Sequence, residues 1–160
     1  MSHEFNSPQI PAMGLVAGLE EDDRLLLSDY GEFLPVQEDQ VLIEEGQDQN
    51  ALYIVISGIL HVHTDKDNKR TLIARVEPGE SLGEINIFDP GTASASVTAK
   101  SFSQVWKATR EDVEGFMNAY PEAGNLLLSA MVGEMSRRIR HMNDKLASVE
   151  AEAEYQNFWE

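Results

Sequence analysis

The sequence predicts a mainly β domain with flanking helices, followed by one long C-terminal helix. Between Glu32 and Lys107, short apolar or alternating runs recur about every 8–12 residues and are separated by turn residues, a spacing typical of a β-sandwich, roll or barrel. Beyond Arg110 the apolar residues recur every three or four positions, which is the period of a helix. With 160 residues, the chain has room for one domain and an appendage.

The N-terminal segment is expected to divide in two. Residues 1–14 are polar, contain Pro8 and Pro11, and are expected to form a flexible arm. Residues 15–30 are expected to form a helix that opens the domain at residues 15–120. The acidic run from Glu20 to Asp23 suits the positive end of a helix dipole, and three leucines that follow supply an apolar face.

Seven segments are expected to be strands because each is apolar or alternating and ends at turn residues. Residues 65–68 lie between two such runs and are expected to form the tip of a hairpin. The predicted strands are Phe33–Val36, Val41–Ile43, Ala51–Ile56, Ile59–His63, Leu72–Val76, Ser96–Ala99 and Ser103–Lys107.

Two helices are expected after the strands. A short helix over residues 110–119 ends at Tyr120-Pro121, because proline interrupts a helix. A long helix with an acidic, aromatic tail occupies residues 121–160. Its apolar residues alternate steps of four and three, a heptad pattern that predicts a coiled coil. We call these residues the seam: Leu128, Val132, Met135, Ile139, Met142, Leu146 and Val149, with the spacing continuing to Ala153.

The seam predicts a homodimer. The first turns of the helix are expected to pack on the chain's own β domain, but the helix is too long for one small domain to cover. β-Branched residues at seam positions such as Val132 and Ile139 favour a two-stranded coil, in which Lys145 can face Glu150 of the other chain.

Composition restricts the partners. The chain has 28 acidic and 12 basic residues, a net charge of −16, so we expect neither nucleic acid nor an anionic membrane surface as a partner. No apolar run of membrane-spanning length is present, and we expect no signal peptide because the first residues have neither a basic nor an apolar stretch. With no cysteine, disulfides and cysteine-ligated metals are excluded, and a cytoplasmic location is expected.

The element order and several motifs resemble the cyclic-nucleotide-binding family, which includes the bacterial catabolite activator and the regulatory subunit of protein kinase A. The resemblance covers roughly residues 15–150 and implies a double-stranded β-helix, a jelly-roll-like β-roll, with a long C-terminal dimerisation helix. The motifs are Val16–Leu19, Val41–Gly46, Ala51–Gly58, Val76–Ile85 and Glu134–Ile139. The last residues are acidic and too few for the DNA-binding domain of the transcription-factor relatives, so we expect a stand-alone regulatory domain.

The resemblance also assigns a phosphate-binding cassette. Gly83 would let the backbone approach the ligand, Glu84 would bind the ribose hydroxyl, and Ser94 would offer a hydroxyl to the phosphate. Ala93 stands where the family has the arginine that neutralises the cyclic phosphate. Losing one charge-assisted hydrogen bond costs about 1.5–3 kcal/mol, or roughly ten- to a hundredfold in affinity. The implied ligand-binding residues are Gly83, Glu84, Ile85, Asn86, Ala93, Ser94, Ala95 and Ser96.

Nothing near the cassette in the sequence replaces this arginine. No basic residue occurs between Arg75 and Lys100, whereas four acidic residues do. We therefore expect no tightly bound cofactor: a ligand would be neutral or cationic, or a cyclic nucleotide bound weakly. On the long helix, Met142 and Asn143 align with the residues that face adenine in the catabolite activator, although Met142 also belongs to the seam.

The sequence predicts a non-enzymatic regulatory module that senses a small molecule and signals through an unknown effector protein. No nucleophile motif and no phosphate-loop lysine is present. Two alternatives remain: a ligand-free dimerisation or protein-interaction domain, and a cupin-like metal site. His61 and His63 alternate along a strand and so share a face, but the cupin spacing is not reproduced, which favours ordinary strand histidines.

Overall fold

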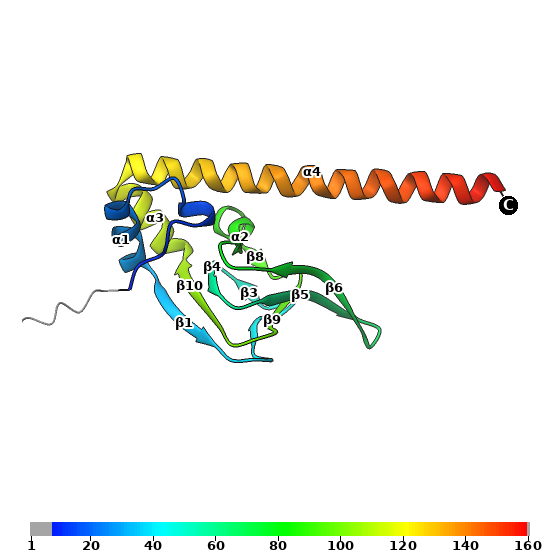
Figure 1. Ribbon diagram of the computed structural model, residues 1–160, viewed down its shortest axis with the longest axis horizontal. Helices are drawn as coiled ribbons and strands as arrows, with labels where there is room; N and C mark the ends of the chain where they lie inside the picture. Colours follow the sequence, from blue (N-terminus) through cyan, green and yellow to red (C-terminus); the bar gives the residue numbers. More distant parts are fainter. Residues whose placement is uncertain (1–7, 160) are drawn as a thin grey trace, which may run out of the picture.

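A computed structural model describes residues 8–159 and confirms the predicted class. Two antiparallel four-stranded sheets form the roll, short helices cover one end, and a long helix runs along the roll and past it (Figure 1). The first sheet has the order β1-β10-β4-β7 and the second the order β2-β9-β5-β6, with a separate β3-β8 pair.

All seven predicted strands are present, and three further strands of two residues each were not predicted. Strands this short contain no repeat of an alternating pattern, so the sequence gives no signal for them. The strands are β1 (Glu32–Val36), β2 (Val41–Ile43), β3 (Asp48–Gln49), β4 (Ala51–Ser57), β5 (Leu60–Lys66), β6 (Lys69–Val76), β7 (Ser81–Leu82), β8 (Gly91–Thr92), β9 (Ser96–Ala99) and β10 (Ser103–Thr109).

The central strand β4 is buried on both faces because its side chains alternate between two cores. Tyr53 and Val55 belong to the core between the sheets. Leu52 and Ile54 belong to a second core beneath the helices, which also contains Trp106. The two cores hold the helices and both sheets in one unit.

The predicted hairpin tip forms at Asp67 and Asn68, between β5 and β6. Both residues have positive φ angles, 53° and 60°, as a two-residue hairpin turn of the tightest type requires. The β5–β6 hairpin extends away from the body of the roll below the long helix (Figure 1).

The N-terminal predictions need two corrections. The predicted helix over residues 15–30 is instead a short 3₁₀ turn, η1 (Gly14–Val16), followed by helix α1 (Glu21–Tyr30). Residues 1–7 lie outside the described part of the chain, but residues 8–14 are not a loose arm, because Ile10 is fully buried and its N–H donates to Ser28 Oγ at 2.9 Å. Ile10 is a single apolar residue between Pro8 and Pro11, so no periodic pattern in the sequence predicts its burial.

The two C-terminal helices lie where the sequence predicts them. Helix α3 (Arg110–Ala119) begins with a capping box, in which Thr109 Oγ1 accepts from the N–H of Asp112 and Asp112 Oδ2 accepts from the N–H of Thr109. Helix α4 (Pro121–Trp159) starts at a proline, which suits the first helical position. No helix in the described residues is long and apolar enough to cross a membrane.

A close backbone approach fixes how α4 lies on the roll. A Cβ atom at Gly124 would lie 2.8 Å from the Cα of Met117 on α3, so a side chain there would push the helices apart. The face of α4 that contains Leu127 and Met131 is fully buried against the helical core. The direction of α4 along the roll therefore follows from packing at its first turns.

Candidate functional site

The cassette is built on a glycine turn that leads into helix α2 (Glu84–Phe88). Gly83 has a φ angle of +87°, and a Cβ atom there would lie 2.1 Å from the carbonyl oxygen of Ala51. Both the backbone conformation and the space require glycine. The predicted role of Gly83, close backbone approach to a ligand, stays a prediction, because the close approach in this structure is to Ala51 of β4.

Glu84 is the most buried charged residue of the cassette, with 1% of its surface exposed. One carboxylate oxygen, Oε1, accepts a hydrogen bond from Ser81 Oγ. The other, Oε2, lies 3.0 Å from Nη1 of Arg138 on α4. A buried carboxylate needs such partners, because an unpaired charge in a protein interior is strongly disfavoured.

The basic stretch of α4 that contains Arg138 is predicted from the sequence to pair with carboxylates of the roll or of a partner chain, and Arg138 does pair with one. Its place at the cassette is the functional feature that the sequence reasoning missed. The prediction that nothing compensates the cassette carboxylates is wrong for Glu84, because Arg138 reaches it from 54 positions later in the chain. Its Nη2 also donates to the carbonyl oxygen of Ser81 at 2.6 Å and to Glu84 Oε1 at 3.3 Å. Arg138 lies seven and eleven positions after the buried Met131 and Leu127, so helical spacing places it on the same face.

Arg138 does not simply replace the missing arginine of the cassette. Its terminal nitrogens already donate three hydrogen bonds, and its Nε lies 3.3 Å from Glu134 Oε1. A guanidinium has five N–H groups, so few remain for a ligand. In this arrangement Arg138 neutralises Glu84 and links α4 to the cassette.

Glu134 joins Arg138 to a second arginine. Its Oε2 accepts from Arg137 Nη2 at 2.9 Å, while its Oε1 faces Arg138. The hydrogen bond from Arg137 is the main reason that the pKa of Glu134 is lowered from its usual value. The result is a chain of alternating charges, Arg137–Glu134–Arg138–Glu84, that runs from the surface of α4 into the cassette.

Seven of the eight predicted cassette residues line one cavity together with Arg138; its volume is about 130 Å³. Ala93 is buried and has no charge to offer, Ser94 is exposed, and the side chain of Asn86 reaches the carbonyl oxygen of Gly91 at 3.4 Å. The lining residues among the predicted set are Gly83, Glu84, Ile85, Asn86, Ala93, Ser94 and Ala95. Ligand pockets usually exceed about 300 Å³, so this cavity is small for a nucleotide.

Three predicted ligand contacts are not at the cavity. Ser96 is buried in β9, where its Oγ accepts from the N–H of Glu45 at 2.9 Å. Met142 and Asn143 are exposed on α4, one turn or more beyond Arg138. The single chain therefore does not bring the predicted base-facing residues to the cassette cavity.

The seam residues are mostly exposed in the single chain. Val132, Ile139, Met142, Leu146 and Val149 have between 56% and 62% of their surface exposed, Leu128 has 36%, and Met135 is half-buried. The neighbouring positions Leu127 and Met131 are instead buried in the core beneath the helices. An apolar stripe of this length on one helix is unusual for a surface that contacts water alone.

The two strand histidines both lie on β5 but differ in burial. His63 is buried, and its Nε2 lies 2.8 Å from Thr98 Oγ1, while Asp65 is 3.6 Å from its Nδ1. Within residues 8–159, no three histidine or carboxylate side chains are placed to share a metal ion.

Comparisons with known proteins agree with the fold. The family model of the cyclic nucleotide-binding domain matches residues 33–120. Over 137 residues the chain is 26% identical to a CRP-like cAMP-activated global transcriptional regulator of Mycobacterium tuberculosis, and the alignment covers 85% of this chain but 59% of that protein. The chain thus spans less than two thirds of that relative's length.

Two solved structures show similar architecture. The N-terminal domain of a transcriptional regulator from Streptomyces coelicolor is 29% identical, with a TM-score of 0.68 over 83% of this chain and 91% of that one. The catabolite activator protein of Thermus thermophilus is 24% identical, with a TM-score of 0.76 over 86% of this chain and 63% of that one. The second likeness is one of fold alone.

Proposed function

The chain belongs to the cyclic nucleotide-binding domain family, and from that premise we propose that it is a non-enzymatic regulatory module. A small ligand binds beside Gly83 and Glu84, and α4 transmits the change to a partner protein. The observation that carries this proposal is Arg138, which connects α4 to the buried carboxylate of the cassette. A ligand that competes for Glu84 must also change the position of Arg138, and with it the helix.

We propose further that the cassette does not bind a cyclic nucleotide tightly. Ala93 supplies no charge, Arg138 is already engaged, and the cavity of about 130 Å³ must enlarge before a nucleotide enters. The Mycobacterium tuberculosis relative is described as cAMP-activated, which makes cyclic AMP the first ligand to test.

Titration calorimetry with cyclic AMP and cyclic GMP tests this proposal. We expect the unchanged protein to show no binding with a Kd of about 1 μM or tighter. Ala93→Arg is expected to increase affinity about ten- to a hundredfold, because it supplies a charged donor at the cavity wall. Thr92→Arg is the matched control, because Thr92 is exposed and does not line the cavity. Micromolar binding by the unchanged protein would overturn the interpretation of Ala93.

A second function, a dimerisation or interaction domain without a ligand, is favoured by the small cavity. In that case Arg138 and Glu84 form a permanent connection between α4 and the roll. Calorimetry separates the two functions, because a ligand-free domain gains no nucleotide binding from Ala93→Arg.

Both functions include a homodimer through the seam. The exposed seam residues support this, since a partner helix would cover them in knobs-into-holes packing. Light scattering on the full chain is expected to give twice the mass of one chain. Leu146→Lys is expected to produce a monomer, while Ser148→Lys, an exposed position outside the seam, is expected to remain a dimer. A monomeric unchanged protein would contradict the coiled coil.

A further inference from the structure

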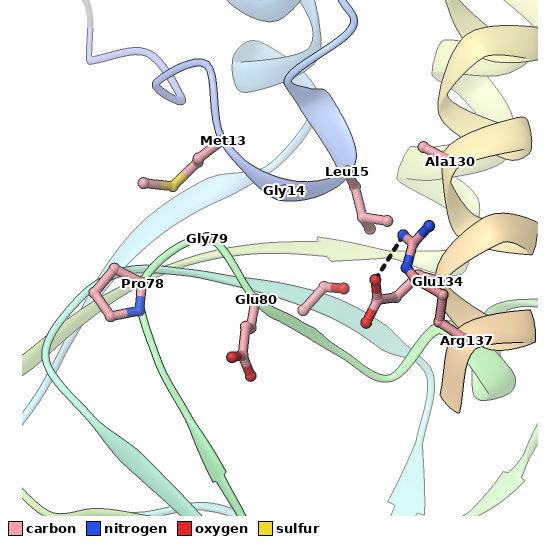
Figure 2. Close-up of a pocket in the computed structure, with 10 residues that line it drawn as sticks. Met13, Gly14, Leu15, Pro78, Gly79, Glu80, Ala130, Glu134 and Arg137 are labelled. Carbon is pink, nitrogen blue, oxygen red and sulfur yellow. Dashed lines mark hydrogen bonds and ion pairs between the residues drawn. The ribbon is translucent and has the colours of Figure 1, made fainter. Parts of the chain in front are cut away.

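A second cavity, separate from that of the cassette, is lined in part by Glu134. It has a volume of about 380 Å³, within the range of small-molecule sites. Its walls come from three parts of the chain: η1 with the preceding Met13, the turn between β6 and β7, and one face of α4 (Figure 2). The cassette cavity is about a third of this size.

The walls of this cavity are held by direct backbone contact. Gly14 has a φ angle of +49°, and a Cβ atom there would lie 1.8 Å from the carbonyl oxygen of Gly79. The turn of η1 and the β6–β7 turn are therefore in contact at one edge of the cavity. Leu15 is 6% exposed and belongs to the core beneath the helices. The shape of the cavity thus follows from the packing of the fold.

The cavity combines apolar walls with one pair of opposite charges. Met13, Leu15 and Ala130 provide apolar surface, and Glu134 and Arg137 form the charged end. Figure 2 shows this pair on α4 facing the loop that carries Leu15, whereas the carboxylate of Glu80 points away from it.

Both members of the pair have unused hydrogen-bonding capacity. A carboxylate offers about four lone-pair sites, and Glu134 accepts one contact on each oxygen from Arg137 and Arg138. Arg137 is 70% exposed and makes one hydrogen bond within the described residues, to Glu134. An ammonium group can therefore join Glu134, and a carboxylate can join Arg137, without separating the existing pair.

Charge balance decides between the ligand classes. An anion alone would be opposed by Glu134 and by the net charge of −16. A cation alone would be repelled by Arg137 and Arg138, and it would offer no acceptor to the guanidinium of Arg137. A zwitterion satisfies both groups and adds no net charge.

We propose that this cavity binds a small zwitterion, an α-amino acid with an apolar side chain. Its ammonium would contact Glu134, its carboxylate Arg137, and its side chain the surface formed by Met13, Leu15 and Ala130. Because Glu134 also holds Arg138, occupancy of this cavity changes the contact between Arg138 and Glu84. This coupling to the cassette rests on the proposed function, whereas binding itself does not.

The experiment is an NMR titration of the ¹⁵N-labelled full chain with three related probes and no nucleotide. They are L-leucine, 4-methylpentanoate, which lacks the ammonium group, and 3-methylbutan-1-amine, which lacks the carboxylate. We expect L-leucine to cause saturable shifts of the amides of Gly14, Gly79 and Ala130, and each fragment to bind about tenfold more weakly or worse.

Variants test the roles of the two charges. Arg137→Gln and Glu134→Gln are each expected to weaken L-leucine about ten- to a hundredfold. Arg140→Gln is the control, since Arg140 is exposed on the same helix and does not line the cavity. Matching amide spectra outside the cavity would show that each variant keeps the fold.

The outcomes are distinct. Shifts that also reach Gly83 in the unchanged protein would support coupling to the cassette. Absence of saturable shifts with L-leucine, binding of either fragment as tight as that of L-leucine, or full binding by Arg137→Gln would overturn the zwitterion site. None of these results depends on whether a cyclic nucleotide binds, so failure here leaves the proposed function to its own calorimetric test.

Discussion

The two halves of α4 have the same apolar spacing but different environments. From Pro121 to Arg138 one face of the helix is packed on the roll, and Leu127 and Met131 are fully buried. From Ile139 to Trp159 every residue is exposed. The first half is held by the chain's own core, whereas the second half requires another surface to bury its apolar residues.

This difference shows what heptad spacing leaves open. The seam passes through Leu128 and Val132, but their sequence neighbours Leu127 and Met131 are the residues buried in the core beneath the helices. Helix α4 therefore has two neighbouring apolar faces, shifted by one residue in the sequence. The face with Leu127 and Met131 is buried, and the face with the seam is exposed. Spacing predicts that a stripe exists, but it does not say which surface the stripe meets.

The largest expected effect is a difference between the two halves of α4 in how much an alanine substitution lowers the free energy of unfolding. Leu127→Ala removes a fully buried side chain and is expected to lower the free energy of unfolding by about 2–5 kcal/mol. Leu146→Ala, in the exposed half, is expected to cost under about 1 kcal/mol at low protein concentration and more as the concentration rises. Urea unfolding at two concentrations measures both. Equal, concentration-independent losses would contradict the distinction between the halves.

A smaller effect is expected at the boundary between the halves, where Arg138 meets Glu84. Arg138→Gln leaves a buried carboxylate without its charged partner. Breaking a buried pair costs about 3–5 kcal/mol, but Arg138 is 40% exposed and water screens it, so we expect about 1–3 kcal/mol.

A double-mutant cycle with Glu84→Gln sharpens this prediction. If the two residues act as a pair, the double variant is expected to lose less stability than the sum of the single variants, by roughly 0.5–3 kcal/mol. Additive losses in urea unfolding would mean that α4 and the cassette are not coupled through this contact.

The smallest expected effect concerns pH. The pKa of Glu134 is lowered from 4.5, chiefly by the hydrogen bond from Arg137. The folded state therefore favours the ionised carboxylate, and this contribution is complete above pH 4.5 and disappears as the pH falls through the lower, folded pKa.

Glu134→Gln is accordingly expected to reduce stability at pH 7 by less than about 1 kcal/mol and to leave a smaller deficit near pH 3. Urea unfolding at both values measures this. Glu152→Gln, an exposed position in the other half of α4, is the matched control and should show the same small change at each pH. A deficit for Glu134→Gln that grows at low pH would contradict the direction of the pKa change.

Local sequence signals were sufficient for most elements. The strands from β1 to β10 that exceed two residues, the short helix α3 and the long helix α4 all follow from alternation, helical period and turn residues. The errors occur where local signals are weak: Ile10 is one apolar residue between prolines, and η1 is a single turn. Both are held by contacts with residues far along the chain.

The candidate site was predicted in part for a similar reason. Residues 83–86 and 93–95 are close in sequence, so one loop motif identifies them, and the structure places them around one cavity. Arg138 is 54 positions from Glu84 and belongs to another element. The helical period predicts which face of α4 carries Arg138. Which residues this face contacts depends on where α4 lies in the fold.

The sequence by itself determined the class of fold, the long apolar stripe of α4 and the absence of arginine at position 93. Each is a property of residue type or of spacing within one segment. The tertiary structure decided that Arg138 neutralises Glu84 and that Leu127, not Leu128, faces the roll. The physical reason is that both depend on the position of α4, which is set by close packing of Gly124 against Met117, a contact between two helices that no local pattern encodes.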